Sequence, residues 1–100
     1  MSVNEWSDAT AMAEALRNKT VSPRELVKDT ISEAERTNTK INAIVSQRYE
    51  KALEEAETRD FSDKPFAGVP IFLKDLGQEQ AGEPSTAGSR LFTSYRAKET

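Results

Sequence analysis

The sequence predicts an α/β chain that is mainly helical, with three helices and one or two short strands. Apolar residues recur at helical spacing through most of the first 60 positions. A short apolar run without alternation follows at residues 69–73, between turn residues. Such a run is typical of a strand buried on both faces. We therefore expect a helical layer over about 7–60 and a strand with its following loop over about 65–95.

The composition describes one domain at most, with little material for a core. The chain has 100 residues, of which 36% are hydrophobic and 31% are charged. The apolar share is below that of a typical globular domain, although the apolar residues follow periodic patterns. We expect an outer layer that packs on something beyond itself.

Charge and residue types exclude several functions. The formal net charge is −3, whereas nucleic-acid and membrane surfaces usually need a cationic patch. The absence of Cys and His removes disulfides, thiol nucleophiles and the commonest metal ligand. We therefore expect no metal, no cofactor and no nucleic-acid or membrane partner. The N-terminus lacks the apolar segment of a signal peptide, so a cytoplasmic location is expected.

Two helices are predicted in the first part of the chain. The first begins at a cap formed by Ser7 or Asp8 and ends near Asn18, with Met12 and Leu16 on its apolar face. The second has a capping box, in which Ser22 is the cap, Pro23 is the first helical residue and Glu25 lies three positions after the cap. Its inward face contains Leu26, Val27, Thr30, Ile31 and Ala34.

A break, a strand and a third helix are predicted next. Residues 38–40 are expected to end the second helix, and residues 41–46, INAIVS, have the β-branched composition of a short strand. Residues 47–59 are predicted to form a surface helix whose charged face is solvated. Its apolar stripe contains Tyr49, Ala52, Leu53 and Ala56. Residues 60–65 form a linker.

Lys74 is the residue for which the sequence suggests a catalytic role. At the end of a buried strand, a lysine must reach water or lose its charge, and an uncharged amine can act as a base. Asp75 should point to the opposite face, so the two side chains need separate partners. A solvated Lys74 and plain turn chemistry for the hydroxyls of Ser85, Thr86 and Ser89 are the simpler alternatives. A Ser–Lys pair made by Ser85 or Ser89 is disfavoured, because no strained nucleophile turn is recognisable.

Two blocks resemble the amidase signature hydrolases. Residues 66–75 read FAGVPIFLKD and residues 86–89 read TAGS, which together look like the first signature block of that family. The upstream order is similar too, with VSPREL opening the second helix, then INAIV, then an Ala/Glu helix that ends in Asp60. The resemblance extends over nearly the whole chain.

The resemblance implies an α/β/α sandwich around a large mixed sheet. It also implies hydrolysis of the carbon–nitrogen bond of a small or non-peptide amide by a Ser–cis-Ser–Lys triad. Lys74 falls on the catalytic lysine of the family, whereas the two serines belong to a later block that this sequence does not contain. We therefore expect 1–100 to be the N-terminal segment of a single amidase domain and to be inactive alone.

The subclass and the partners have alternatives. KDLG with AGEPSTAGSR looks more like stand-alone amidases, including those similar to 6-aminohexanoate cyclic dimer hydrolases. The A-type subunits of glutamyl-tRNA amidotransferases commonly have Asn where this chain has Leu76, and they stay as one alternative. A non-catalytic helical interaction module, in which Lys74 is structural, is another. The strand around residues 71–73 lacks neighbours, so we expect self-association through it, or partial disorder from about Ala67 onward.

Overall fold

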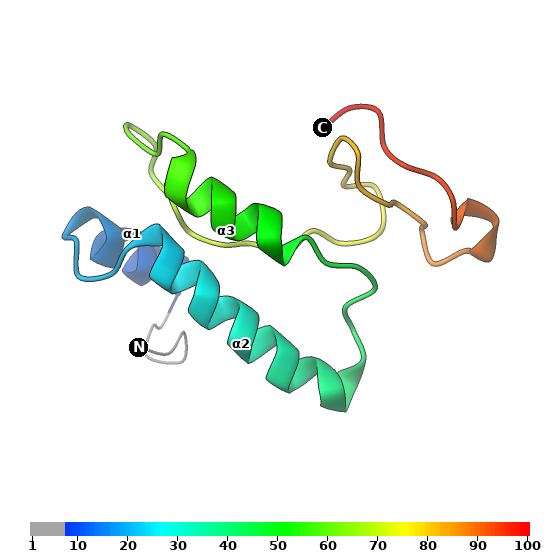
Figure 1. The fold of residues 1–100 in the computed structure, drawn as a ribbon, viewed down its shortest axis with the longest axis horizontal. Coiled ribbons are helices and arrows are strands. Elements are labelled where there is room, and N and C mark those ends of the chain that lie inside the picture. The colour runs from blue at the N-terminus through cyan, green and yellow to red at the C-terminus, as the bar shows by residue number, and fades with distance from the viewer. Residues whose placement is uncertain (1–7) are drawn as a thin grey trace. The chain divides into compact units, whose positions relative to one another are not determined.

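The computed structural model describes residues 8–100, which belong to two units, Met1–Pro70 and Ile71–Thr100. The α-helices lie in the first unit, and the second contains a short 3-10 helix, η2 (Arg90–Phe92) (Figure 1). No strand occurs among the described residues, where an isolated bridge pairs Pro84 with Arg96. The prediction of a mainly helical chain with three helices is confirmed, and the predicted strands are wrong. The sandwich architecture stays a prediction.

Helix α1 (Ala9–Arg17) begins and ends where the sequence predicts. The Asp8 carboxylate accepts a hydrogen bond from a main-chain N–H of the first turn at 2.8 Å. The other predicted cap, Ser7, lies outside the described residues. Asn18 ends the helix, and its N–H donates to the Glu14 carbonyl at 2.9 Å.

Helix α2 (Pro23–Ile41) starts at the predicted cap but runs further than expected. The Ser22 hydroxyl accepts a hydrogen bond from the Glu25 N–H at 3.1 Å. Residues 38–40 are helical, so the break predicted there is wrong. None of these three residues is Gly or Pro, and the helix continues until Asn42 adopts a left-handed conformation with φ of 49°.

The connection to helix α3 (Tyr49–Thr58) is a loop, not the strand predicted at residues 41–46. Helix α2 extends into this segment, and Asn42 ends it. The Asn38 side-chain oxygen accepts a hydrogen bond from the Ile44 N–H at 2.9 Å. A side chain, rather than a neighbouring strand, therefore accepts the hydrogen bond of the Ile44 N–H. β-Branched composition does not produce a strand without a partner in register.

Helix α3 packs against α2 and confirms the predicted amphipathic pattern. Ala56 is buried, whereas Glu50 and Glu54 are exposed. An ion pair between Arg24 and Glu57, 2.9 Å long and half exposed on both sides, joins α2 to α3. In the part of the chain that the structure describes, no helix has the length and apolar content needed to cross a membrane.

A small core lies where α1 meets the start of α2. Leu26 is 1% exposed and clusters with Ala15 and Val21. Met12 and Leu16, the two residues predicted to form the apolar face of α1, pack against this cluster. The helical unit therefore has its own buried centre.

The chain returns close to this core after α3. Gly68 has φ of 87°, and a Cβ there would lie 3.2 Å from both Leu16 Cδ1 and Pro23 Cγ. Glycine is therefore required both for the conformation and for the close approach. The Arg17 guanidinium donates to the Pro65 carbonyl at 3.3 Å, which ties the same segment to α1.

The apolar run at residues 69–73 is irregular and exposed. Ile71 is 76% exposed, Phe72 56% and Leu73 49%. A buried strand needs a hydrogen-bonded neighbour and covering layers, and residues 8–100 supply neither for this run. The expectation of self-association around residues 71–73 stays a prediction.

Candidate functional site

Lys74 lies beside an exposed turn of the second unit. Its main-chain N–H donates to Gln78 Oε1 at 3.0 Å. Residues 75–77 form the turn, which Gly77 completes with φ of 79°. From the sequence, Lys74 could either lose its charge at the end of a buried strand or reach water. Lys74 is exposed in the structure, because most of the run at residues 69–73 is itself exposed and cannot shield the amine.

The Asp75 carboxylate joins this turn to the hydroxyl-rich loop. Asp75 Oδ1 accepts a hydrogen bond from the Thr86 N–H at 2.7 Å, and Oδ2 accepts one from the Thr86 hydroxyl. The sequence predicted that Asp75 would need a partner separate from Lys74, and Thr86 is that partner. We call these contacts, together with the N–H groups of Ala87 and Gly88, the Asp75–Thr86 clasp.

The clasp stabilises the ionised form of Asp75. The Thr86 hydroxyl lowers the pKa of Asp75 most, followed by the Thr86 N–H. The N–H groups of Gly88 and Ala87 lower this pKa further, while partial burial acts in the opposite direction. Ala87 and Gly88 have φ of 50° and 72°. Successive N–H groups in such a turn form a concavity that suits an anion.

The two serines of the loop take structural positions. Ser89 Oγ accepts a hydrogen bond from the Leu91 N–H at 3.2 Å and caps η2. The Ser89 N–H donates to the Thr86 carbonyl at 2.9 Å. Ser85 is partly buried, and no hydrogen bond within residues 8–100 joins either serine to Lys74. The geometry therefore does not assemble a Ser–Lys pair from these residues.

Thr86 is the site residue to which sequence reasoning assigned only a turn. The signal that could have identified it is the TAGS sequence itself, since a Thr two positions before Gly88, which tolerates positive φ, offers a hydroxyl and several N–H groups to one anion. The carboxylate that uses them lies 11 residues earlier. The described residues contain no group of three or more His, Cys, Asp or Glu side chains that could hold a metal ion.

The chain is similar in sequence to proteins named as amidases. A family model described as Amidase matches residues 25–100. A 6-aminohexanoate-cyclic-dimer hydrolase from Paenarthrobacter ureafaciens is 41% identical over 97 residues, covering 95% of this chain and 19% of the relative. A lipoamidase from Enterococcus faecalis is 41% identical over 86 residues, covering 84% of this chain and 12% of the relative.

A third relative has a different printed role. It is the A-type subunit of a glutamyl-tRNA(Gln) amidotransferase from Nitratidesulfovibrio vulgaris, 35% identical over 89 residues, covering 85% of this chain and 18% of the relative. The chain thus spans a fifth or less of the length of these relatives. No solved structure matches the chain.

Proposed function

Because this chain belongs to the amidase family, we propose that it contributes the acid–base lysine, Lys74, of an amide hydrolase. The observation that supports this is the family match over residues 25–100, which includes both FAGVPIFLKD and TAGS. By resemblance, Lys74 takes the place of the lysine in a Ser–cis-Ser–Lys triad. Residues 1–100 then form the N-terminal segment of a single amidase domain with an α/β/α sandwich.

In this mechanism the uncharged amine of Lys74 accepts a proton. The bridging serine gives it that proton and takes another from the nucleophilic serine, whose oxygen forms a bond to the amide carbonyl carbon. The protonated amine returns the proton to the leaving nitrogen as the carbon–nitrogen bond breaks. Water then attacks the acyl-serine along the same proton path and releases the acid.

An uncharged lysine needs surroundings with little water, because desolvation disfavours the charged form. Lys74 is exposed in the structure of residues 8–100. We therefore propose that parts of the complete enzyme outside this segment cover the amine. The relatives, of which the chain spans 19% or less, are long enough to supply such a cover.

We propose a small or non-peptide amide as the substrate class. The support is the pair of relatives at 41% identity, whose names specify a cyclic amide dimer and a lipoamide. The 6-aminohexanoate cyclic dimer and a simple anilide are the first substrates to test, since they sample a cyclic and an open-chain amide.

Substitution of Lys74 in the complete enzyme tests the proposal. Lys74→Ala should lower kcat by about 10²- to 10⁴-fold, the usual contribution of a general acid–base, with little change in KM. Lys64→Ala is the matched control, because Lys64 is also an exposed lysine of this segment and has no proposed role in the chemistry. Unchanged turnover in Lys74→Ala would contradict the assignment.

The 100-residue chain alone should not hydrolyse either amide, because in this proposal both triad serines lie outside it. Mixing purified chain with substrate and following amine release measures this directly. Turnover by the chain that disappears in Lys74→Ala would show that these residues contain a complete catalytic site.

An amidotransferase A-type subunit is the second candidate. The observation in its favour is the 35% identity with the corresponding subunit of a glutamyl-tRNA(Gln) amidotransferase. The hydrolase is preferred because the hydrolase relatives have higher identity, 41%. Stable co-purification of the complete protein with further subunits would favour the amidotransferase, whereas an active protein free of such subunits would favour the hydrolase.

A further inference from the structure

We propose that Asp75 is a positioning residue for Lys74, which acts by holding the backbone of residues 74–75 against the Thr86–Gly88 turn. This inference rests on the proposed function, since it assigns Asp75 a role in the amide hydrolase. Asp75 does not take a proton from the substrate. It acts through the lysine that precedes it in the chain.

Several hydrogen-bond donors converge on the Asp75 carboxylate. Asp75 accepts hydrogen bonds from the Thr86 hydroxyl and from the Thr86 N–H at 2.7 Å, and the N–H groups of Ala87 and Gly88 also stabilise its charge. The Thr86 hydroxyl accepts in turn from the Gly88 N–H at 3.3 Å. Hydrogen bonds to an ionised acceptor are roughly twice as strong as neutral ones. The clasp therefore constrains the turn at residues 75–77, beside which Lys74 lies.

Hydrogen bonds hold the chain both at Lys74 and at Asp75. The Lys74 N–H is held by Gln78 Oε1 at 3.0 Å on one side, and the Asp75 side chain is held by Thr86 on the other. The Lys74 side chain itself is exposed. These contacts therefore hold the backbone next to Lys74, while its side chain remains to be covered by the parts of the complete enzyme proposed above. Misplacement of an acid–base group by about 1 Å can cost about 100-fold in rate.

A comparison with Asp60 shows that this role is not a general property of turn aspartates. The Asp60 carboxylate accepts a hydrogen bond from the Ser62 N–H at 2.9 Å, and Ser62 lies two positions further along the chain. This bond closes a local turn. The Asp75–Thr86 clasp joins residues 11 positions apart and so fixes one loop against another. Asp60 is therefore the matched control for Asp75.

The experiment measures kcat and KM in the complete enzyme for four variants. Asp75→Asn replaces one acceptor oxygen with an NH₂ group, so it cannot satisfy all the donors of the clasp. It should lower kcat by about 10- to 100-fold with KM within about 3-fold of the wild-type value. Thr86→Val removes the hydroxyl and should lower kcat by about 10-fold. Thr86→Ser keeps the hydroxyl and should restore most of the rate, and Asp60→Asn should leave kcat unchanged.

The double variant Asp75→Asn/Thr86→Val adds a test of coupling. Because both changes break the same clasp, its loss in kcat should be smaller than the product of the two single losses. If the clasp were purely structural, the variants that break it would have a lower melting temperature and a lower yield of folded enzyme. Their kcat per folded molecule would be unchanged, so Thr86→Ser would have no loss of kcat to restore. If Asp75→Asn does not fold, kcat per folded molecule is compared between Thr86→Val and Thr86→Ser. A lower kcat in Thr86→Val alone supports the positioning role, and equal values contradict it.

The outcomes separate this inference from the proposed function. Wild-type kcat in Asp75→Asn and in Thr86→Val, alongside an inactive Lys74→Ala, would overturn the positioning role and leave the catalytic lysine in place. Wild-type kcat in Lys74→Ala would overturn the proposed function itself. A loss in both the Asp75 and Thr86 variants with rescue by Ser supports the clasp as the device that positions Lys74.

Discussion

Each of the two units of the chain is stabilised internally in a different way. Met1–Pro70 has a buried centre around Leu26, and its helices begin and end at recognisable caps. In Ile71–Thr100 the buried hydrophobic residue is Ala97, and large apolar side chains are exposed. These exposed side chains are Ile71, Phe72, Leu73, Leu76, Leu91, Phe92 and Tyr95. The first unit is thus organised by burial, and the second by turns and hydrogen bonds.

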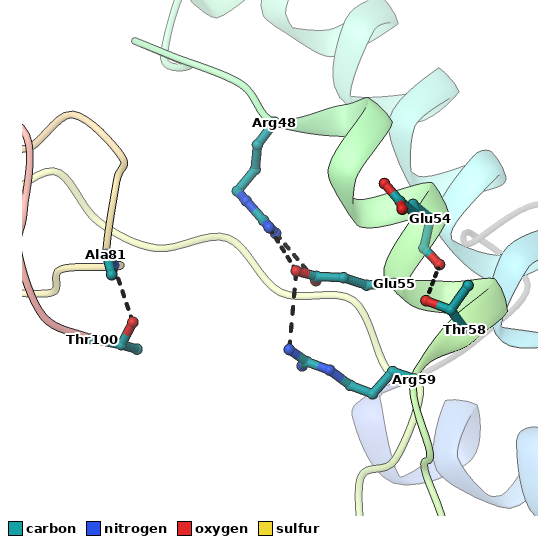
Figure 2. Close-up of polar contacts among 7 residues, drawn as sticks. All are labelled: Arg48, Glu54, Glu55, Thr58, Arg59, Ala81 and Thr100. Carbon is teal, nitrogen blue, oxygen red and sulfur yellow. Dashed lines mark hydrogen bonds and ion pairs between the residues drawn. The ribbon is translucent and has the colours of Figure 1, made fainter.

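Polar contacts have different functions in the two units. In the helical unit, the Arg48 guanidinium meets the Glu55 carboxylate on the surface of α3 (Figure 2). Hydrogen bonds join residues distant in sequence in both units, such as Arg17 to Pro65 in the first and the Ala81 N–H to the Thr100 hydroxyl at 3.0 Å in the second, the latter also drawn in Figure 2. In the first unit these contacts supplement a buried core, whereas in the second unit, where Ala97 is the buried hydrophobic residue, the conformation depends more on them.

Removal of core volume should produce the largest effect. In the 100-residue chain, Leu26→Ala should lower the free energy of unfolding by about 2–5 kcal/mol, because Leu26 is 1% exposed. Leu91→Ala, at a position that is 81% exposed, should change it by less than about 0.5 kcal/mol. Urea denaturation followed by the helical circular-dichroism signal measures the effect of Leu26→Ala, and amide hydrogen exchange at Phe92 and Thr93, whose N–H groups are hydrogen-bonded, measures that of Leu91→Ala. Equal losses would break the distinction between the two units.

A pair of glycine substitutions sharpens the same comparison. Gly68→Ala in the helical unit combines a positive φ with a Cβ only 3.2 Å from Leu16 and Pro23, whereas Gly77→Ala in the second unit has a positive φ and open space. We expect Gly77→Ala to cost about 1–2 kcal/mol of local conformational free energy. Gly68→Ala should cost more than this, because neighbouring side chains must also move.

The measurement differs between the two glycines. Urea denaturation reports Gly68→Ala through the helical signal, and amide hydrogen exchange at Lys74, whose N–H is hydrogen-bonded to Gln78, reports Gly77→Ala locally. An unfolding free energy of Gly68→Ala equal to that of wild type would show that residues 65–68 do not pack on the core as described. Wild-type exchange in Gly77→Ala would show that the Lys74 turn does not need a left-handed residue.

The helical unit could be predicted from sequence because its determinants are local. The Ser22 cap, Pro23 and the apolar spacing of α2 lie within a few residues of the structure that they specify. The end of α2 was mispredicted, because polar residues at 38–40 are compatible with a helix and only the left-handed Asn42 stops it. For α2, local signals thus predict where the helix begins better than where it ends.

The second unit could not be predicted in the same way, because its determinants are distant in the chain. Residues 71–73 have strand-forming composition, but strand formation depends on partners that residues 8–100 do not supply. The exposure of Lys74 follows from the same absence. The link between Asp75 and Thr86, which are 11 positions apart, depends on how the chain between them folds, and composition does not specify this.

The smallest expected effect concerns the surface ion pair of the helical unit. Arg48 Nη2 lies 2.6 Å from Glu55 Oε1, and Arg59 Nη2 lies 4.0 Å from the same oxygen (Figure 2). The hydrogen bond from Arg48 is the main cause that lowers the pKa of Glu55. Arg48→Gln should reduce the free energy of unfolding by about 0.2–1 kcal/mol at neutral pH, the usual range for partly exposed pairs.

The pH dependence of that loss decides whether the charge is responsible. A carboxylate whose pKa is lower in the folded state stabilises the fold above its unfolded pKa, about 4.3 for Glu, and this contribution disappears as the pH falls through the folded value. The difference between Arg48→Gln and wild type should therefore be present at pH 7 and vanish well below pH 4. Arg24→Gln, which breaks the more exposed pair with Glu57, is the control and should cost less. If the difference in unfolding free energy between Arg48→Gln and wild type persists in acid, Arg48 stabilises α3 by packing its side-chain methylenes and not by its charge. Apolar contacts would then stabilise the helical unit at its surface as well as in its core.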